Sequence, residues 1–247
     1  MDQHIITLKW GNRYGPHYVN RLASAVRRHT KTPVSIVCFT DDRAGIDPSV
    51  IIYQIPEIDL PPAEMVTGWR KLCLFRNDLP IEGLALFLDL DIVITGPLDD
   101  FFTFGNEDEI PIIHNWIPAH KTWFRPDPMI GNSSVFRFQL NHCTFVWEQF
   151  HREKDWALAT FRPPQSYLTH CIRPRLKFWP AAWVRSFKRH CLPIFPLNLI
   201  FAPHLPKDAH IIAFHGKPDP DEAAAGYVVK RVHHRSIPAR WIDKHWR

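Results

Sequence analysis

The sequence has few cysteines, and none are spaced as metal ligands usually are. The five cysteines of this 247-residue chain are odd in number, widely scattered and without a C-x-x-C motif; they are Cys38, Cys73, Cys143, Cys171 and Cys191. This distribution argues against a structural zinc site and against a disulfide framework. We therefore expect a reducing, cytoplasmic environment.

Long apolar runs are also missing. No uninterrupted stretch reaches the length of a membrane span. The first residues, Met1 to His4, lead straight into a strand, without the basic and apolar regions of a signal peptide. We expect a protein that is neither secreted by a signal peptide nor integral to a membrane.

Glycine is scarce, with 10 residues, and no Gly-rich loop that could cradle a phosphate follows the first strand. A nucleotidyltransferase is therefore a poor candidate. No internal repeat and no long linker divides the chain, and its 45% hydrophobic content suffices for a substantial core. We expect a single large domain.

Basic residues gather in the last segment, residues 227–247, although the formal net charge of the whole chain is only +5. Against one acid, Asp243, this segment has two tryptophans and six basic residues: Trp241, Trp246, Lys230, Arg231, Arg235, Arg240, Lys244 and Arg247. Such a tail suits an anionic membrane surface, and equally a solvated helix whose tryptophans dock on the domain. No basic and aromatic stripe recurs elsewhere, so we expect no nucleic-acid partner.

Strand and helix patterns alternate in the first half of the chain. The ranges are strands at 4–8, 34–39, 50–54 and 84–88, and helices at 18–29 and 69–77. Alternation of this kind predicts an α/β fold, with a mixed, mostly parallel sheet flanked by helices and a ligand crevice beyond the carboxyl ends of the strands. After Asp100 the pattern loosens. A helix is expected at 141–151.

Two carboxylates follow the last of these strands. The stretch from Phe87 to Ile94 reads FLDLDIVI, with Asp89 and Asp91 among apolar residues. Residues i and i+2 of a strand share a face, so both carboxylates could approach one divalent cation while Leu88, Leu90 and Ile92 pack the other face. Because buried carboxylates are rare without a partner, the pattern predicts a metal site.

Four motifs together resemble GT-A fold glycosyltransferases, most of all glycosyltransferase family 8 and its bacterial relatives. They are a basic helix at 69–72 followed by the D-x-D strand, the segment 131–135 that resembles an N-[SA]-G-V turn, Gln165 of a D-Q motif, and 214–218 of an H-x-x-G-x-x-K-P element. The resemblance implies a Rossmann-like single domain at residues 1–226. Its nucleotide-binding half covers about residues 1–100 and its acceptor-side half about 101–226.

The resemblance also implies an activity: transfer of a hexose-like sugar from a nucleotide-diphosphate sugar, with UDP-sugar as the expected donor and retaining chemistry. Asp89, Asp91 and His215 would hold Mn²⁺ or Mg²⁺, and an imidazole ligand suits Mn²⁺ better. Lys71 and Lys217 would contact the diphosphate. Tyr14 and Asp41 would flank the base and ribose. Gln165, Asn132 and Lys217 are the expected catalytic residues.

The acceptor leaves no trace in the sequence: it is an unidentified glycan, lipid-linked or protein acceptor. A lipid-linked acceptor would place the protein at the inner membrane surface through its basic tail. The sequence also departs from the family pattern. Pro164 replaces the Asp of the D-Q motif, Ser134 replaces a Gly, and alignment of the late glycines puts Ala213 and Asp219 where the family has His and Lys.

Two other readings remain. Asp89 to Val93 also fits the D-x-D-x-[TV] motif of haloacid dehalogenase-like phosphatases, although more than 80 residues precede it here. Those enzymes normally carry the motif on their first strand. A catalytically silent carbohydrate-binding protein is the third reading, since ten tryptophans could stack on sugars.

Overall fold

The computed structural model describes residues 2–116 and 129–247. It confirms the β-α-β opening: β1 (Gln3–Lys9), α1 (Pro16–His29) and β2 (Ser35–Thr40). Helix α1 forms because Pro16 fixes its first turn and apolar residues recur at three- and four-residue spacing. Three basic residues in its last turn complement the helix dipole.

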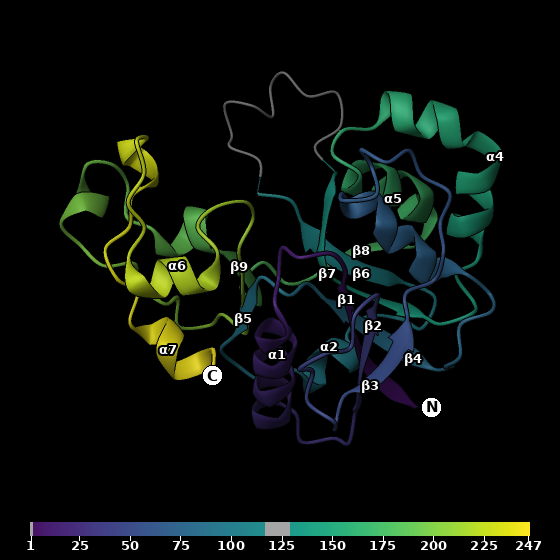
Figure 1. The fold of residues 1–247 in the computed structure, drawn as a ribbon, viewed down its shortest axis with the longest axis horizontal. Coiled ribbons are helices and arrows are strands. Elements are labelled where there is room, and N and C mark those ends of the chain that lie inside the picture. Colours follow the sequence, from purple (N-terminus) through teal and green to yellow (C-terminus); the bar gives the residue numbers. More distant parts are fainter. Residues whose placement is uncertain (1, 117–128) are drawn as a thin grey trace.

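The remaining elements complete an α/β chain (Figure 1). The strands are β3 (Ile51–Gln54), β4 (Leu84–Leu88), β5 (Ile92–Ile94), β6 (Ile110–His114), β7 (Gly131–Gln139), β8 (Leu176–Phe178), β9 (Val184–Ser186) and β10 (Ile211–Ala213). The helices are α2 (Asp99–Thr103), α4 (Phe145–Thr160), α5 (Gln165–Ile172), α6 (Pro220–Ala225) and α7 (Trp241–His245). Short helical turns are η1 (Gly68–Phe75), η2 (Arg173–Arg175), η3 (Phe187–Cys191), η4 (Leu197–Leu199) and η5 (Val232–His234).

Seven strands form the main sheet in the order β3-β2-β1-β4-β7-β6-β8. Strands β3, β2, β1 and β4 run parallel, whereas β7 is antiparallel to both β4 and β6. The mixed, mostly parallel sheet predicted from the sequence is thus confirmed. The carboxyl ends of β1, β2 and β4 lie at one edge, which is where an α/β sheet offers a ligand crevice.

The acidic pair lies between two strands rather than on one, but the predicted alternation holds, since Leu88, Leu90 and Ile92 are buried while both acids reach one cavity. Strand β4 ends at Leu88, and β5 begins only at Ile92 in a second sheet of order β5-β10-β9. The chain therefore changes sheets across Asp89-Leu90-Asp91. Leu90 is buried in this crossing, and the two acids flank it.

The segment 131–135 was expected as a turn, and it is part of β7 instead. Asn132 is buried in this extended strand. Strands β6 and β7 were not predicted; residues 117–128 of the loosely patterned stretch between them lie outside the described residues. The predicted helix at 69–77 is the 3-10 helix η1, and that at 141–151 begins later, with α4.

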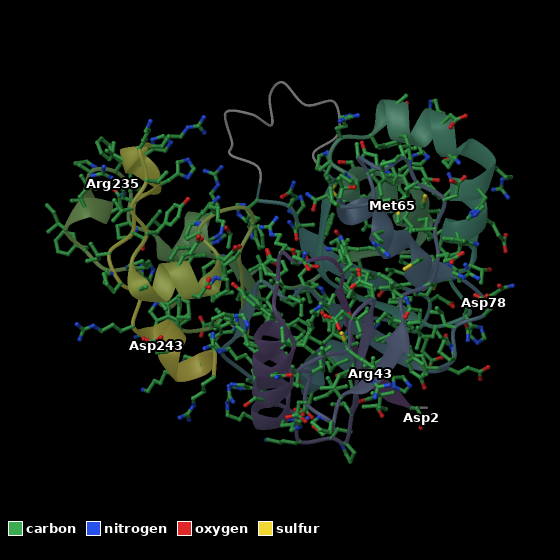
Figure 2. The ribbon with its side chains drawn as sticks, in the orientation of Figure 1. Asp2, Arg43, Met65, Asp78, Arg235 and Asp243 are labelled. Atoms are coloured by element: carbon green, nitrogen blue, oxygen red, sulfur yellow. The ribbon has the colours of Figure 1, made fainter. Side chains whose placement is uncertain are left out.

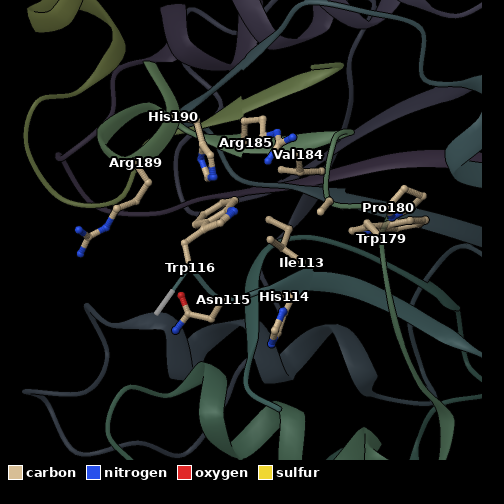
Figure 3. A pocket seen from close by; sticks show the side chains of 11 residues that line it. Ile113, His114, Asn115, Trp116, Trp179, Pro180, Val184, Arg185, Arg189 and His190 are labelled. Carbon is tan, nitrogen blue, oxygen red and sulfur yellow. The ribbon is translucent and has the colours of Figure 1, made fainter. Parts of the chain in front are cut away.

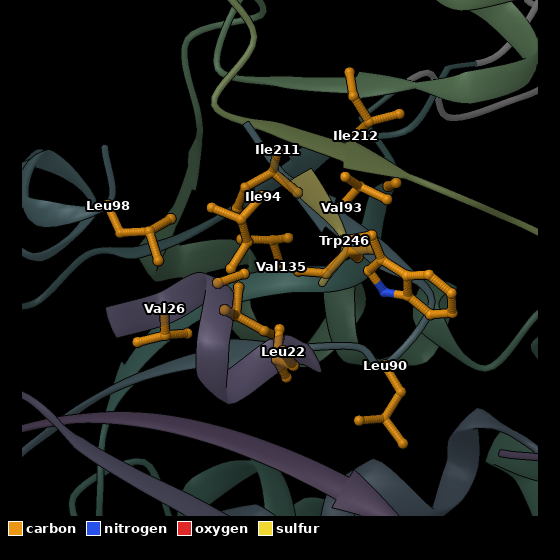
Figure 4. Packing of buried hydrophobic residues seen from close by; sticks show 14 of the residues in the cluster. Leu22, Val26, Leu90, Val93, Ile94, Leu98, Val135, Ile211, Ile212 and Trp246 are labelled. Atoms are coloured by element: carbon orange, nitrogen blue, oxygen red, sulfur yellow. The ribbon is translucent and has the colours of Figure 1, made fainter. Parts of the chain in front are cut away.

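The core joins the two sheets through α1. Leu22 and Val26 of α1 pack against Val93 and Ile94 of β5 and the neighbouring β10, together with Trp246 (Figure 4). Truncating one of these fully buried side chains to alanine would cost about 2–5 kcal/mol. This packing fixes the position of the D-x-D crossing relative to the parallel strands.

The basic tail packs on the domain. Trp246 is 6% exposed, and its ring meets the Tyr18 ring edge-on at a centroid distance of 4.9 Å. The Arg21 guanidinium lies 4.2 Å from the centroid of the Trp246 ring. Arg28 of α1 donates to the backbone carbonyls of His245 and Arg247. Within the described ranges, no helix is long and apolar enough to cross a bilayer.

Candidate active site

A cavity of about 480 Å³ opens at the carboxyl ends of the parallel strands. The loop from β1 to α1, the start of η1 and the D-x-D crossing line it, and Asp89, Asp91, Lys71 and Tyr14 all reach its wall. The structure thus brings four of the predicted site residues to one place. They come from segments that are far apart in the sequence.

The loop between β1 and α1 is held by Asp41 at the end of β2. Gly11 lies at φ +58°, in the left-handed region, and its backbone N–H donates to Asp41 Oδ2 over 3.0 Å. Asp41 itself is exposed. Asp41 therefore positions Gly11 in the cavity wall but does not itself line the cavity.

Lys71 is buried and makes a close ion pair with Asp89. Its Nζ lies 2.7 Å from Asp89 Oδ1 and donates to Ser133 O over 2.9 Å. The pairing satisfies a lysine that is only 8% exposed. Helix η1 presents Lys71 in this direction because Thr67 caps it, accepting from the Trp69 N–H.

Asp91 is held by Tyr14. The Tyr14 hydroxyl donates to Asp91 Oδ2 over 3.0 Å and lies 3.4 Å from Asp219 Oδ1. Burial and the charge of Asp89 raise the pKa of Asp91 to about 7, and Lys71 and the bond from Tyr14 oppose the rise. Burial together with Asp91 and Asp219 raises the pKa of Tyr14. Burial thus disfavours the charged forms of both Asp91 and Tyr14 at this wall of the cavity.

His215 lies beside the D-x-D crossing, but its ring points elsewhere. The preceding residue, Phe214, donates its N–H to Asp91 O over 3.0 Å. The His215 Nε2 is 2.6 Å from Ser186 Oγ, and its ring stacks with Trp116 at 5.8 Å. Burial and the nearby Lys188 and Arg189 lower the pKa of His215 to about 4, so the ring is neutral at pH 7. Over residues 2–116 and 129–247, no group of three His, Cys, Asp or Glu side chains is placed to hold a metal ion by itself.

A second cavity, of about 360 Å³, has Trp116 in its wall (Figure 3). The Trp116 ring stacks with His215, and the end of β6, the residues after β8, strand β9 and part of η3 form the other walls. Arg185, Arg189 and His190 line it, and its described lining residues include no carboxylate. The second cavity is therefore basic, whereas two acids and two cations, Arg13 and Lys71, line the first.

Solved structures match this architecture, whereas no protein-family model and no curated protein matches the sequence. The galactosyltransferase LgtC, solved with donor and acceptor sugar analogs, aligns with a TM-score of 0.60 at 13% identity, over 98% of this chain and 94% of LgtC. The glycosyltransferase GlyE of Streptococcus pneumoniae TIGR4 aligns with a TM-score of 0.58 at 13% identity, over 89% of this chain and 56% of GlyE. The bifunctional glycosyltransferase WbbM gives 0.57 at 10%, over 89% of this chain and 46% of WbbM.

This chain has the GT-A fold. At such low identities the likeness concerns the fold. The GT-A fold gives no support to the phosphatase reading of the D-x-D pair. Asp89 follows β4, the fourth strand of the chain, rather than the first, and its carboxylate is paired with Lys71.

Two more of the predicted site residues, Gln165 and Asn132, lie near Lys71. Gln165, the first residue of α5, accepts from the Ser133 N–H at 3.4 Å through Oε1, and Lys71 donates to the carbonyl of the same serine. Asn132 precedes that serine and accepts from the Ser134 N–H at 3.0 Å. Gln165 is thus linked to the Lys71–Asp89 pair through one residue of β7.

Lys217 and Asp219 form a separate ionic cluster at the start of α6. Lys217 Nζ donates to Asp219 Oδ2 over 2.8 Å and to Glu222 Oε1 over 2.7 Å, and these bonds raise its pKa. Asp219 also caps α6 and lies 3.5 Å from Arg13. In the sequence, Asp219 stands out only as a departure from the family's lysine position. Its near-complete burial beside Tyr14 makes it a third acid close to the site.

Proposed function

We propose that this protein is a metal-dependent glycosyltransferase that uses a nucleotide-diphosphate sugar. The observation that carries the proposal is the pair Asp89 and Asp91 on the wall of one cavity, at the carboxyl ends of the parallel strands of a GT-A fold. UDP is the expected nucleotide, by the resemblance of the motifs. The cavity of about 480 Å³ falls within the usual size of a small-molecule site.

The donor atoms present suit a hard divalent cation. Asp89 and Asp91 offer carboxylate oxygens that face one cavity, where their charges repel each other in the absence of a cation. Mg²⁺ and similar ions are commonly held by one or two carboxylates, with substrate phosphates completing the shell. When bound, Mn²⁺ or Mg²⁺ would act as a Lewis acid toward the departing diphosphate.

Residues of the protein hold the two carboxylates in position. Lys71 fixes Asp89 and brings an ammonium group to the cavity wall, and Tyr14 orients Asp91 by its hydrogen bond. Lys217 is 52% exposed and is proposed to contact the diphosphate. His215 is proposed as a further metal ligand. It would have to exchange its bond with Ser186 for the metal.

The sugar side of the site is proposed at Gln165 and Asn132, with the acceptor entering through the second cavity (Figure 3). Among the described residues that line the donor cavity, the carboxylates are Asp89 and Asp91 alone. An inverting transferase needs a base to deprotonate the acceptor, and these two are assigned to the metal. Retaining chemistry is the proposed outcome, by the resemblance of the motifs to a retaining family.

Calorimetric binding tests the donor site. UDP, GDP and CDP are each titrated with Mn²⁺, with Mg²⁺ and with a chelator, into the wild type and into Asp91→Asn. The matched control is Asp155→Asn, on an exposed position of α4. We expect one nucleotide to bind only with metal, and Asp91→Asn alone to abolish that binding.

The same titrations separate the alternatives. Binding of no nucleotide under any metal condition would overturn the transferase proposal. Metal-dependent binding without turnover of any sugar form of that nucleotide would leave a catalytically silent binding protein. Release of the sugar, measured as free nucleotide, would establish a catalytic site.

A further inference from the structure

Residues 194–201 expose an unusual amount of apolar surface. Ile194, Ile200 and Phe201 are 83%, 69% and 57% exposed, and Phe195, Leu197 and Leu199 are also exposed. Single exposed apolar residues are common on protein surfaces, but six large ones within eight residues are not. The segment is nevertheless ordered by η4 and its backbone bonds, such as Phe201 N–H to Leu197 O. The exposed apolar side chains therefore project from a segment with defined backbone structure.

A second segment, residues 228–235, extends the same surface. Asn198 is fully buried between the two, and its Nδ2 donates to the carbonyls of Val232 and Arg235 over 3.0 and 2.9 Å. The second segment adds Val228, which is 81% exposed. We call residues 194–201 and 228–235 the docking surface. In Figure 1 it lies at the end of the molecule that carries α6 and α7, across from α4, and Figure 2 marks Arg235 there.

The surroundings of this surface are basic. Neither residues 187–207 nor residues 226–242 contain an aspartate or glutamate. Lys230 and Arg231 are exposed within the docking surface, and Arg189 of η3 is exposed beside it in the sequence. Apolar side chains ringed by cations are the pattern of an interfacial membrane contact, because the chains enter the acyl boundary and the cations meet anionic headgroups.

We propose that the docking surface binds the surface of an anionic lipid bilayer. A second copy of the chain is the poorer occupant. A symmetric dimer would set the same cations against themselves, with no acid in either segment to pair with them. The contact also differs from the one expected from the sequence, since Trp246 is buried against α1. Ile194, Ile200 and Phe201 take the place of the tryptophans.

The docking surface begins three residues after η3, which lines the second cavity. Arg189 lines that cavity, and it lies in η3, directly before the exposed segment. An acceptor anchored in the same bilayer would thus enter beside the headgroups. This last step rests on the proposed transferase function, whereas bilayer binding does not.

Co-sedimentation with vesicles tests the binding, without nucleotide or metal. The full chain is mixed with vesicles of phosphatidylcholine alone, or with part of it replaced by phosphatidylglycerol. The variants are Ile194→Ser/Ile200→Ser and Lys230→Gln/Arg231→Gln, and the matched control is Ile51→Ser, an exposed isoleucine of β3. Circular dichroism verifies that each variant is folded.

We expect binding to the phosphatidylglycerol vesicles that weakens with salt. Ile194→Ser/Ile200→Ser should lower it at least about tenfold. Each charge removed at Lys230 and Arg231 should cost about fivefold, and Ile51→Ser should bind as the wild type does. Equal binding by the double isoleucine variant, or no preference for anionic vesicles, would overturn the inference. A third outcome would also overturn it: no vesicle binding, together with a dimer that sedimentation velocity detects for the wild type but not for Ile194→Ser/Ile200→Ser. That result would assign the surface to a second copy of the chain.

Discussion

The Tyr14 hydroxyl donates to Asp91 Oδ2 over 3.0 Å, and this bond ties the loop after β1 to the D-x-D crossing. Tyr14→Phe removes only this hydroxyl. We expect nucleotide binding in Mn²⁺ to weaken by about threefold to tenfold, the usual worth of one hydrogen bond. Tyr18→Phe is a matched control, since the Tyr18 hydroxyl donates to Asp221 instead. Calorimetry on both variants checks this, and equal losses in the two would show that the Tyr14 bond has no special role.

Lys71 and Asp89 form a nearly buried pair, with side-chain exposures of 10% and 21%. Lys71→Met would leave Asp89 without its cation. We expect the free energy of unfolding to fall by about 3 kcal/mol, the lower end for buried pairs because Asp89 keeps some solvent. The double variant Lys71→Met/Asp89→Asn should regain much of that stability and still fail to bind nucleotide. Urea denaturation measures the first effect. A double variant no more stable than the single one would contradict the pairing argument.

Much of the nucleotide half could be predicted because its signals are local. The apolar runs of β1, β2 and β4, and the periodicity of α1, lie within single segments. Two acids at the end of such a run stand out without any knowledge of contacts. The chain's change of sheets between Leu88 and Ile92 could not be read in this way, because it depends on β5 pairing with β10, more than 100 residues later.

The second half depends on pairings between distant residues. Strand β7 carries Asn132 and two serines, which favour turns locally, yet it is antiparallel to β4 and buried. The partner of His215 is Ser186, 29 residues away, and no motif marks it. In the sequence alone, Asp219 is only a mismatch with a family lysine. Only the position of α6 reveals that it faces Tyr14.

His215 has a test of its own role. If its neutral imidazole serves as a metal ligand, His215→Ala should weaken nucleotide binding at least about tenfold in Mn²⁺, and less in Mg²⁺, which favours oxygen ligands. Titration of the same variant with both ions measures the difference, and Ser186→Ala, which removes the bond to His215 and the cap of η3, serves as the comparison. Equal losses with both ions would confine His215 to its contacts with Ser186 and Trp116.

Asp99 links the end of α1 to α2 and should make stability depend on pH. Its carboxylate accepts from the backbone N–H groups of Lys31 and Thr32, and these bonds hold the pKa of Asp99 below its usual range despite some desolvation. A lowered folded-state pKa stabilises the fold above the unfolded pKa of about 3.9 and loses this effect as the pH falls through the folded value.

Asp99→Asn should therefore destabilise the protein at pH 7 by about 0.5–1 kcal/mol, a figure kept small because the group is partly exposed. The difference in the free energy of unfolding between Asp99→Asn and the wild type should disappear as the pH falls below the usual carboxyl range. Urea denaturation across this range measures it, with Asp100→Asn on the solvent side as control. A gap that stays constant down to acid pH would show that the carboxylate charge is not its source.

Trp246 decides whether the basic tail is structurally part of the domain. Its indole is 6% exposed, packs on Tyr18 and lies under the guanidinium of Arg21. We expect Trp246→Ala to lower the free energy of unfolding by about 3–5 kcal/mol, as for other buried tryptophans. Arg247→Ala keeps the indole and should cost far less. Unfolding by urea compares the two, and a single cooperative transition in each would place the tail in the same folding unit as α1. A wild-type stability for Trp246→Ala would instead show that the tail docks without contributing, and would leave its basic residues free to bind elsewhere.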